Sequence, residues 1–238
     1  MKKTLSLVLA LILSVFCLAS CGGESIDVNN AYDLYANAMK AAENGMEVKM
    51  TMNVAGVDTV TNLKLGKDAC EITTTVEGME SAIIFVDGVM YMEMDLGALG
   101  GVQKMKQELS FEEFMEENGS GTDMPDLTKE MLKDIKVETV DGKKSFTIDL
   151  TSQSELVESM LGKEYADANL GSASLTCNFS AKGVMTGYSL NCFITVMGQS
   201  MELDIQMEIT SIGKQPTISA PEDADSYKDL SSLGGLLG

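Results

Sequence analysis

Acidic side chains are the most abundant groups in this sequence that could do chemistry. The chain of 238 residues has 36 Asp and Glu against 17 Lys and Arg, and it contains no His. Acid–base catalysis needs two carboxyl groups held in different environments. The densest group has helical spacing and predicts one solvated helix face instead, and it consists of Glu112, Glu113, Glu116 and Glu117. We therefore expect no catalytic residues and no enzyme, because histidine-based triads are excluded as well.

Metal, cofactor and nucleic-acid sites are not indicated either. Asp123 and Asp126 lack the spaced oxygen ligands and the central glycine of a calcium loop. The glycines of residues 97–101 have no lysine and no strand-to-helix context, so they do not form a phosphate loop. The formal net charge of -19 repels nucleic acid. We expect no metal, no cofactor and no nucleic-acid partner, and the oligomeric state stays open.

Three cysteines in the body of the chain, Cys70, Cys177 and Cys192, lie at apolar strand positions. One disulfide plus one free thiol is possible. We favour three buried free thiols, because Cys packs as a small hydrophobic residue and no tight spacing indicates a metal site.

Methionine is unusually frequent, with 18 residues in the chain. Three interpretations compete: an ordinary core, a deformable apolar cavity for ligands of varied shape, and Cu(I) binding by thioethers. Copper is disfavoured without His or a Met-rich loop, and carbohydrate binding is disfavoured because Trp is absent. The candidate ligand-binding wall consists of Met46, Met50, Met52, Met90, Met92, Met94, Met201 and Met207.

The elements that would position this wall are mostly strands. Apolar residues recur at helical spacing over residues 28–44, with Gly45 placed to end the helix. The period then changes to two for about ten or eleven strands, several joined at hairpin signals such as Asp87-Gly88 and Asp141-Gly142. One face of these strands is apolar. The pattern predicts a mainly β (α+β) fold, a single highly curved antiparallel half-barrel whose concave side is covered by helices.

Helical insertions interrupt the strands. Ser110 to Glu113 form a capping box, a second helix is expected from Pro125, and a third from the capping box at Ser152 to Glu155. The stretch 97–107 is expected to be helix or loop. We expect one domain over residues 28–220, then a disordered, acidic, low-complexity tail over residues 221–238.

The N-terminus has an export signal. Lys2 and Lys3 precede an apolar stretch, which is too short to span a membrane and ends at Leu18-Ala19-Ser20-Cys21. These four residues resemble the lipobox of bacterial lipoproteins. The resemblance implies cleavage before Cys21, a diacylglyceryl group on the Cys21 sulfur, and a lipidated tether over residues 21–27. Removal of residues 1–20, which carry two lysines and no acid, takes the net charge from -19 to -21. We expect a lipid-anchored protein on the extracytoplasmic face of the cell membrane.

Residues 83–92, Ile-Ile-Phe-Val-Asp-Gly-Val-Met-Tyr-Met, follow an N-terminal helix and alternating strands, and this arrangement is similar to LolA/LppX-like lipoproteins. The end of the strand set, residues 207–212 leading to residues 218–222, is also similar. The resemblance implies a curved half-barrel closed by helices, in a family whose members carry lipids or lipoprotein acyl chains. The lipobox points to the membrane-anchored, uncharacterised branch.

Two functions remain. The first is a non-enzymatic surface lipoprotein that holds an apolar or amphiphilic ligand, such as a lipid or acyl chain, in the half-barrel. The alternative is an envelope interaction or sensing module with a packed barrel and an acidic partner-binding surface.

Overall fold

The computed structural model describes residues 28–54, 56–97, 100–118, 127–132, 135–140, 143–153, 157, 169–196 and 199–230. The helices are α2 (Val28–Ala42), α3 (Phe111–Asn118) and the 3-10 turn η3 (Ala224–Ser226). The strands are β1 (Met46–Val54), β2 (Val57–Leu65), β3 (Cys70–Val76), β4 (Met79–Val86), β5 (Val89–Asp95), β6 (Val102–Glu108), β7 (Lys136–Val140), β8 (Lys143–Asp149), β9 (Asn169–Phe179), β10 (Met185–Val196), β11 (Gln199–Ile212) and β12 (Lys228–Asp229).

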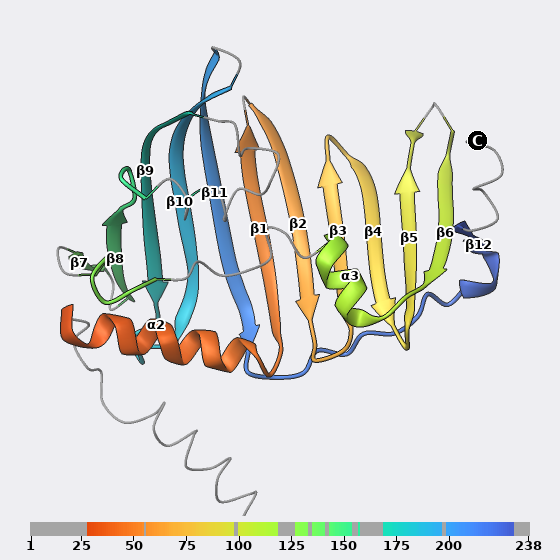
Figure 1. Ribbon diagram of the computed structural model, residues 1–238, viewed down its shortest axis with the longest axis horizontal. Coiled ribbons are helices and arrows are strands. Elements are labelled where there is room, and N and C mark those ends of the chain that lie inside the picture. The colour runs from red at the N-terminus through yellow and green to blue at the C-terminus, as the bar shows by residue number, and fades with distance from the viewer. Residues whose placement is uncertain are drawn as a thin grey trace, which may run out of the picture.

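All twelve strands belong to one open sheet in the order β12-β6-β5-β4-β3-β2-β1-β11-β10-β9-β8-β7. Two runs of hairpins, β1–β6 and β7–β11, meet where β1 pairs with β11. Every neighbouring pair is antiparallel except β12 with β6. Figure 1 shows the sheet face-on, with the earliest strand and the latest long strand side by side at its centre. The expected mainly β fold with one large antiparallel sheet is confirmed.

Local turn chemistry explains the tight hairpins. Asp87 and Gly88 both have positive φ values of 53° and 77°, which a two-residue turn with the twist of a hairpin requires. Glu77 and Gly78 do the same between β3 and β4, with φ values of 50° and 85°. The sequence analysis did not single out this second turn, because a glutamate is an unusual residue at positive φ. The expected turn at Asp141-Gly142 lies outside the described residues.

The alternation of the strands gives the sheet an inner face and an outer face. The inner face carries the apolar partners of each pair, for example Val48 opposite Leu63 and Cys70 opposite Phe85. The outer face carries the intervening polar residues, such as Lys64 paired with Glu71. Because opposed residues share a face, the register alone assigns every strand residue to one side.

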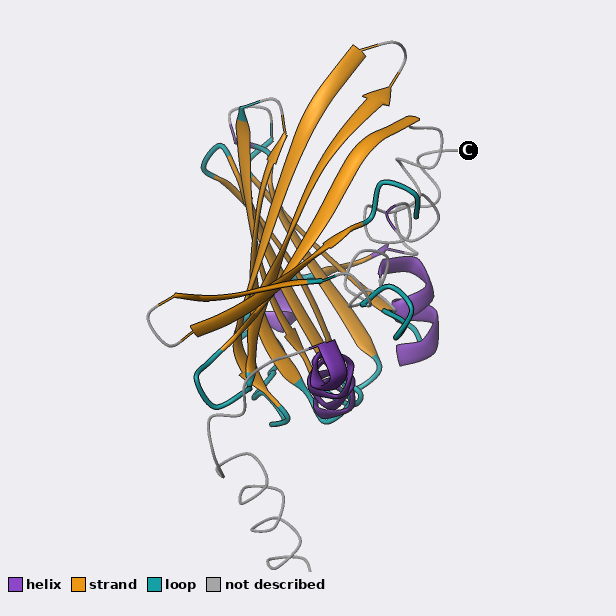
Figure 2. Ribbon diagram, turned by 90° about the vertical axis from the view of Figure 1, so that its left-hand side faces the viewer, coloured by secondary structure: helices purple, strands orange, loops and turns teal. Residues whose placement is uncertain are grey.

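Both helices lie on the inner side, as the side view in Figure 2 shows. Ala31, Tyr35 and Ala38 of α2 are buried, and this helix packs on β10 and β11. The α3 helix begins with the expected capping box: the Ser110 backbone N–H donates to Glu113 Oε2 at 2.7 Å, and the Glu113 N–H donates to Ser110 Oγ at 3.2 Å. Phe114 of α3 packs on Phe85 of β4 with 5.0 Å between ring centroids.

One expected helix and one expected helix or loop differ from the structure. Residues 127–132 do not form the helix expected from Pro125, although Leu127 and Leu132 are buried as an apolar face requires. Most of the helix expected after Ser152 lies outside the described residues. The stretch 97–107, expected as helix or loop, contains strand β6. Its pattern Val-Gln-Lys-Met-Lys-Gln-Glu has no clear apolar face, and pairing with β5 overrides that weak local signal.

The segment after β11 corrects the expectation of disorder beyond residue 220. Residues 213–229, here called the C-terminal strap, pass the ends of β1–β5 and reach the far edge of the sheet (Figure 1). The Gly213 N–H donates to the Gly45 carbonyl at 2.9 Å, and the Lys67 N–H donates to Gln215 Oε1 at 3.2 Å. At the far edge Tyr227 is buried and β12 pairs in parallel with β6. Composition missed this segment, because its order depends on a few contacts and not on a local pattern.

Candidate functional site

All eight methionines of the predicted wall lie on the inner face. Met50 of β1 stands opposite Met207 of β11, and Met90 of β5 stands opposite Phe85 of β4. The two groups are not adjacent, however, because three strands separate β1 from β5. Neighbouring strands lie about 4.8 Å apart, so the two groups line opposite ends of one wall about 19 Å wide.

Burial separates these methionines into core residues and surface residues. Met46, Met90 and Met207 are almost fully buried and act as ordinary core. Met50, Met52, Met92 and Met201 are half-buried. Met94 is 38% exposed. The first group therefore cannot contact a ligand without rearrangement, and only the others are accessible.

The inner face is fully buried at one side and only partly buried at the other, and this partly buried side is called the open wall here. On β9 and β10 it is closed: Leu175 and Cys177 are fully buried and Leu190 is 1% exposed. On β3, β4 and β5 the same face is only half-buried at Ile72, Ile83 and Met92. These three residues stand directly opposite one another and form one apolar row across the strands. Among the described elements, α3 packs on this side of the sheet through the contacts of Phe111 and Phe114 with Phe85.

Hydroxyl groups follow the open apolar row. Two residues further along the strands, the inner face carries Thr61, Thr74 and Ser81, which are paired across β2, β3 and β4. The hydroxyls of Thr61 and Thr74 lie 3.2 Å apart and share one hydrogen bond. These residues and Met105, which stands opposite Met92, complete the open wall. The alternation along the strands already places Thr61, Thr74, Ser81 and Met105 on this face. The excess of methionine alone does not point to the hydroxyl groups.

The three thiols of the body are buried and free, as expected. Burial raises the pKa of Cys70 and of Cys177 to about 12 and that of Cys192 to about 11. The pKa of Cys70 is raised further by the neighbouring Glu71 carboxylate. All three are therefore protonated at neutral pH and are poor nucleophiles and poor metal ligands.

Within the described part of the chain, no three acidic, cysteine or histidine side chains gather in a way that could hold a metal ion. Of the acidic helix cluster, Glu113 serves the capping box, and hydrogen bonds from Ser110 lower its pKa. Asp123 and Asp126 lie outside the described residues, as does the lipobox with Cys21. Searching the described residues for a helix long and apolar enough to span a bilayer finds none.

Comparison with known proteins adds little. No protein-family model matches the chain, and no curated protein sequence matches it. Among solved structures, the chain is similar to the one titled "Crystal structure of MucB in complex with MucA(peri)", with 6% sequence identity over 80% of this chain and 100% of that chain. The TM-score of that match is 0.11. A likeness of this size carries no argument about fold or function.

Proposed function

We propose that this chain is a non-enzymatic lipoprotein that binds an apolar or amphiphilic ligand, a lipid or acyl chain, on the inner face of a LolA/LppX-like half-barrel. Its anchor is the lipid on Cys21, and its place is the extracytoplasmic face of the cell membrane. The observation that supports the ligand most strongly is the half-open apolar row formed by Ile72, Ile83 and Met92.

This row differs from the other half of the sheet. There, strands β9–β11 bury the same face almost completely. Burying apolar area stabilises a protein by about 25 cal/mol per Å², so an apolar row left half-covered forgoes a stabilisation that a ligand can supply. Half-buried methionines at both ends of the wall favour ligands of varied shape, because thioether chains repack easily.

The order of side chains along the strands favours an amphiphile. The apolar row Ile72, Ile83 and Met92 is followed by the hydroxyl row with Thr61 and Thr74, two residues and therefore about 7 Å further along the strands. An acyl chain fits the first row, and a polar group at its end fits hydrogen bonding to the second. A wall of closely packed apolar residues would bind neither the acyl chain nor its polar end group.

A binding assay with matched variants tests this proposal. Residues 22–238 are titrated with a fluorescent fatty acid, as wild type, Ile72→Trp and Thr73→Trp. Ile72 faces inward and Thr73 outward on the same strand, so both changes add an indole to β3 but only one adds it to the wall. We expect saturable binding that Ile72→Trp weakens at least tenfold and Thr73→Trp leaves unchanged. Equal binding by both variants would place the ligand elsewhere.

The interaction module is the second candidate. Its support is the closed inner face over β9 and β10, together with the acidic composition of the chain. If the open wall binds no apolar probe and its variants change only stability, this second function is favoured.

A further inference from the structure

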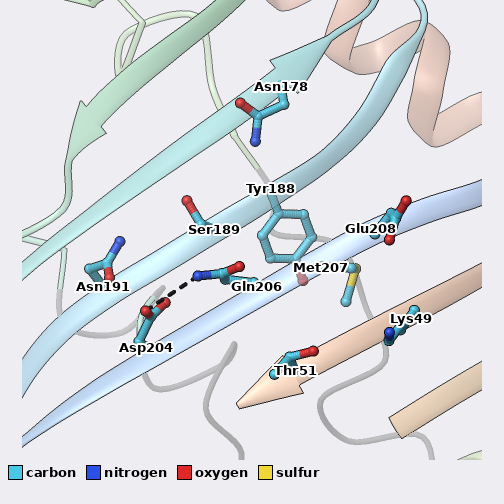
Figure 3. Close-up of a pocket in the computed structure, with 10 residues that line it drawn as sticks. All are labelled: Lys49, Thr51, Asn178, Tyr188, Ser189, Asn191, Asp204, Gln206, Met207 and Glu208. Atoms are coloured by element: carbon cyan, nitrogen blue, oxygen red, sulfur yellow. Dashed lines mark hydrogen bonds between the residues drawn. The ribbon is translucent and has the colours of Figure 1, made fainter. Parts of the chain in front are cut away.

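The outer face of the sheet contains two adjoining hollows. The first, of about 420 Å³, lies over β1, β9, β10 and β11 and is drawn in Figure 3. The second, of about 460 Å³, lies over β8–β11. They adjoin at Asn191, which lines both, and are together called the outer groove here. It lies on the face opposite to the proposed ligand wall and is independent of it.

The strand β10 is bulged beside the first hollow. Gly187 stands there between Asn178 of β9 and Glu208 of β11, which both line the hollow. A Cβ at this position would collide with the Met207 carbonyl oxygen of β11. Glycine within a strand marks such bulges and close approaches.

One buried carboxylate oxygen in the groove has no hydrogen-bond donor within the described residues. Asp204 Oδ2 accepts a bond of 3.4 Å from Gln206 Nε2, the dashed line in Figure 3, whereas Asp204 Oδ1 is buried and has no partner among the described residues. A buried acceptor without a partner costs about 1–3 kcal/mol. Asp204 lines the groove, and a turn of its carboxylate would bring this oxygen to a ligand donor and remove the cost.

The other polar groups of the groove are of mixed type. Amides come from Asn178 and Asn191, hydroxyls from Thr51 and Ser189, and an ammonium group from Lys49. Lys49 stands opposite Glu208 across β1 and β11 but forms no ion pair within the described residues. A ligand that both donates and accepts, as hydroxyl groups do, matches this set better than a pure donor or a pure acceptor.

The charge and the length of the groove restrict the class of ligand that it can bind. The groove carries one lysine against four carboxylates, those of Asp149, Glu202, Asp204 and Glu208, so anionic ligands are repelled. The seven residues of β11 from Glu202 to Glu208 span about 20 Å, which suits a short chain of sugar rings and not a single ring. Phe193, opposite Glu202, is 48% exposed and offers an aromatic face for stacking.

We propose that the outer groove binds an uncharged or amino-substituted oligosaccharide. Sugar hydroxyls supply the donor for Asp204 and accept from Lys49, and the apolar face of one ring stacks on Phe193. The scarcity of aromatic residues argued against sugars in the sequence, but one exposed ring at the end of the groove is sufficient for one stacking contact. A peptide is disfavoured because β9–β11 lie inside the sheet and have no free backbone edge to pair with.

Titration calorimetry on the signal-free chain, residues 22–238, tests the site with four probes: chitotetraose, cellotetraose, an acidic tetragalacturonate, and spermidine. The variants are Asn191→Ala, Phe193→Ala and the control Thr75→Ala, an outer-face hydroxyl on β3, two strands away from β1. We expect saturable binding of at least one of the first two probes. Asn191→Ala and Phe193→Ala should each weaken it tenfold or more, with unchanged thermal midpoints, and Thr75→Ala should not weaken it.

Three results would overturn the proposal. The first is no binding of either neutral or amino tetrasaccharide. The second is sugar binding that all three variants leave intact, which would place it elsewhere. The third is binding of spermidine alone, which would make the groove an acidic patch for cations. The fatty-acid titration tests the inner face of the sheet. A negative result with the sugars therefore leaves the proposed lipid function untouched.

Discussion

The hydroxyl of Tyr227 donates a hydrogen bond of 2.9 Å to Glu93 Oε2, which ties the C-terminal strap to the outer face of β5. The Tyr227 ring also packs edge-on against Tyr91, with 5.4 Å between ring centroids. Lys104 of β6 joins both partners, with ion pairs of 3.3 Å to Glu93 and 2.7 Å to Asp223 of the strap. The strap therefore secures the far edge of the sheet from the side opposite to the ligand wall.

This contact predicts a pH dependence of stability. Burial, and then the bond to Glu93, raise the pKa of Tyr227 from 10.0 to about 12. Because the folded pKa is the higher one, the stabilisation is complete below pH 10 and is lost as pH rises from 10 to about 12. Urea unfolding of wild type and Tyr227→Phe across this range should show a steeper loss for wild type. Parallel curves would mean that the Tyr227 hydroxyl is not held as described.

The assignment of faces on β11 gives a second prediction. Ile205 is 7% exposed on the inner face and Gln206 is exposed on the outer face. Ile205→Asp buries an unpaired carboxylate and should cost about 3 kcal/mol or more, whereas Gln206→Asp should change stability by about 0.5 kcal/mol or less. Chemical denaturation of the two variants measures both. Similar losses would show that the register is wrong.

Thiol reactivity gives a third prediction. With pKa values of about 11 to 12, Cys70, Cys177 and Cys192 are protonated and shielded in the native protein. Iodoacetamide at neutral pH should leave all three unmodified in residues 22–238, and should modify all three in urea, as intact mass would report. Fast native labelling, or a native mass two hydrogens below the reduced one, would contradict this.

The anchor is tested at its attachment residue. If Cys21 carries the lipid, Cys21→Ala should leave the precursor uncleaved or move the protein out of the detergent phase in a phase-separation experiment. Wild type should remain in that phase. An unmodified Cys21 in the intact mass of wild-type protein extracted from its own membrane would refute lipid anchoring.

Local signals predicted the elements that depend on local chemistry. The Asp87-Gly88 turn, the Ser110–Glu113 capping box and the inward set on β11 follow from residues close together in the chain. The sequence did not reveal what depends on distant partners. The strand β6 needs β5, and the order of the strap needs Tyr91 and Glu93, more than 130 residues before Tyr227.

The candidate site likewise combines features that follow from local signals with features that depend on distant residues. Placing the methionines on one face required only their alternation along the strands, as with Met90, Met92 and Met94. Their unequal burial depends on which parts of the inner face other segments cover, as α3 does at Phe85, and no local pattern reports that. The outer groove brings together side chains from β1, β9, β10 and β11, such as Lys49, Asn178 and Asp204, which are far apart in the sequence.

Native mass spectrometry of the protein purified gently from its own host tests the central claim most directly. The half-open row of Ile72, Ile83 and Met92 predicts a co-purifying lipid or fatty acid, recovered in an organic extract of the same sample. Its occupancy should fall at least tenfold in Ile72→Trp and stay unchanged in Thr73→Trp. A ligand-free mass for wild type, with no rise in thermal midpoint on adding phospholipids or fatty acids, would contradict ligand binding and favour the interaction module.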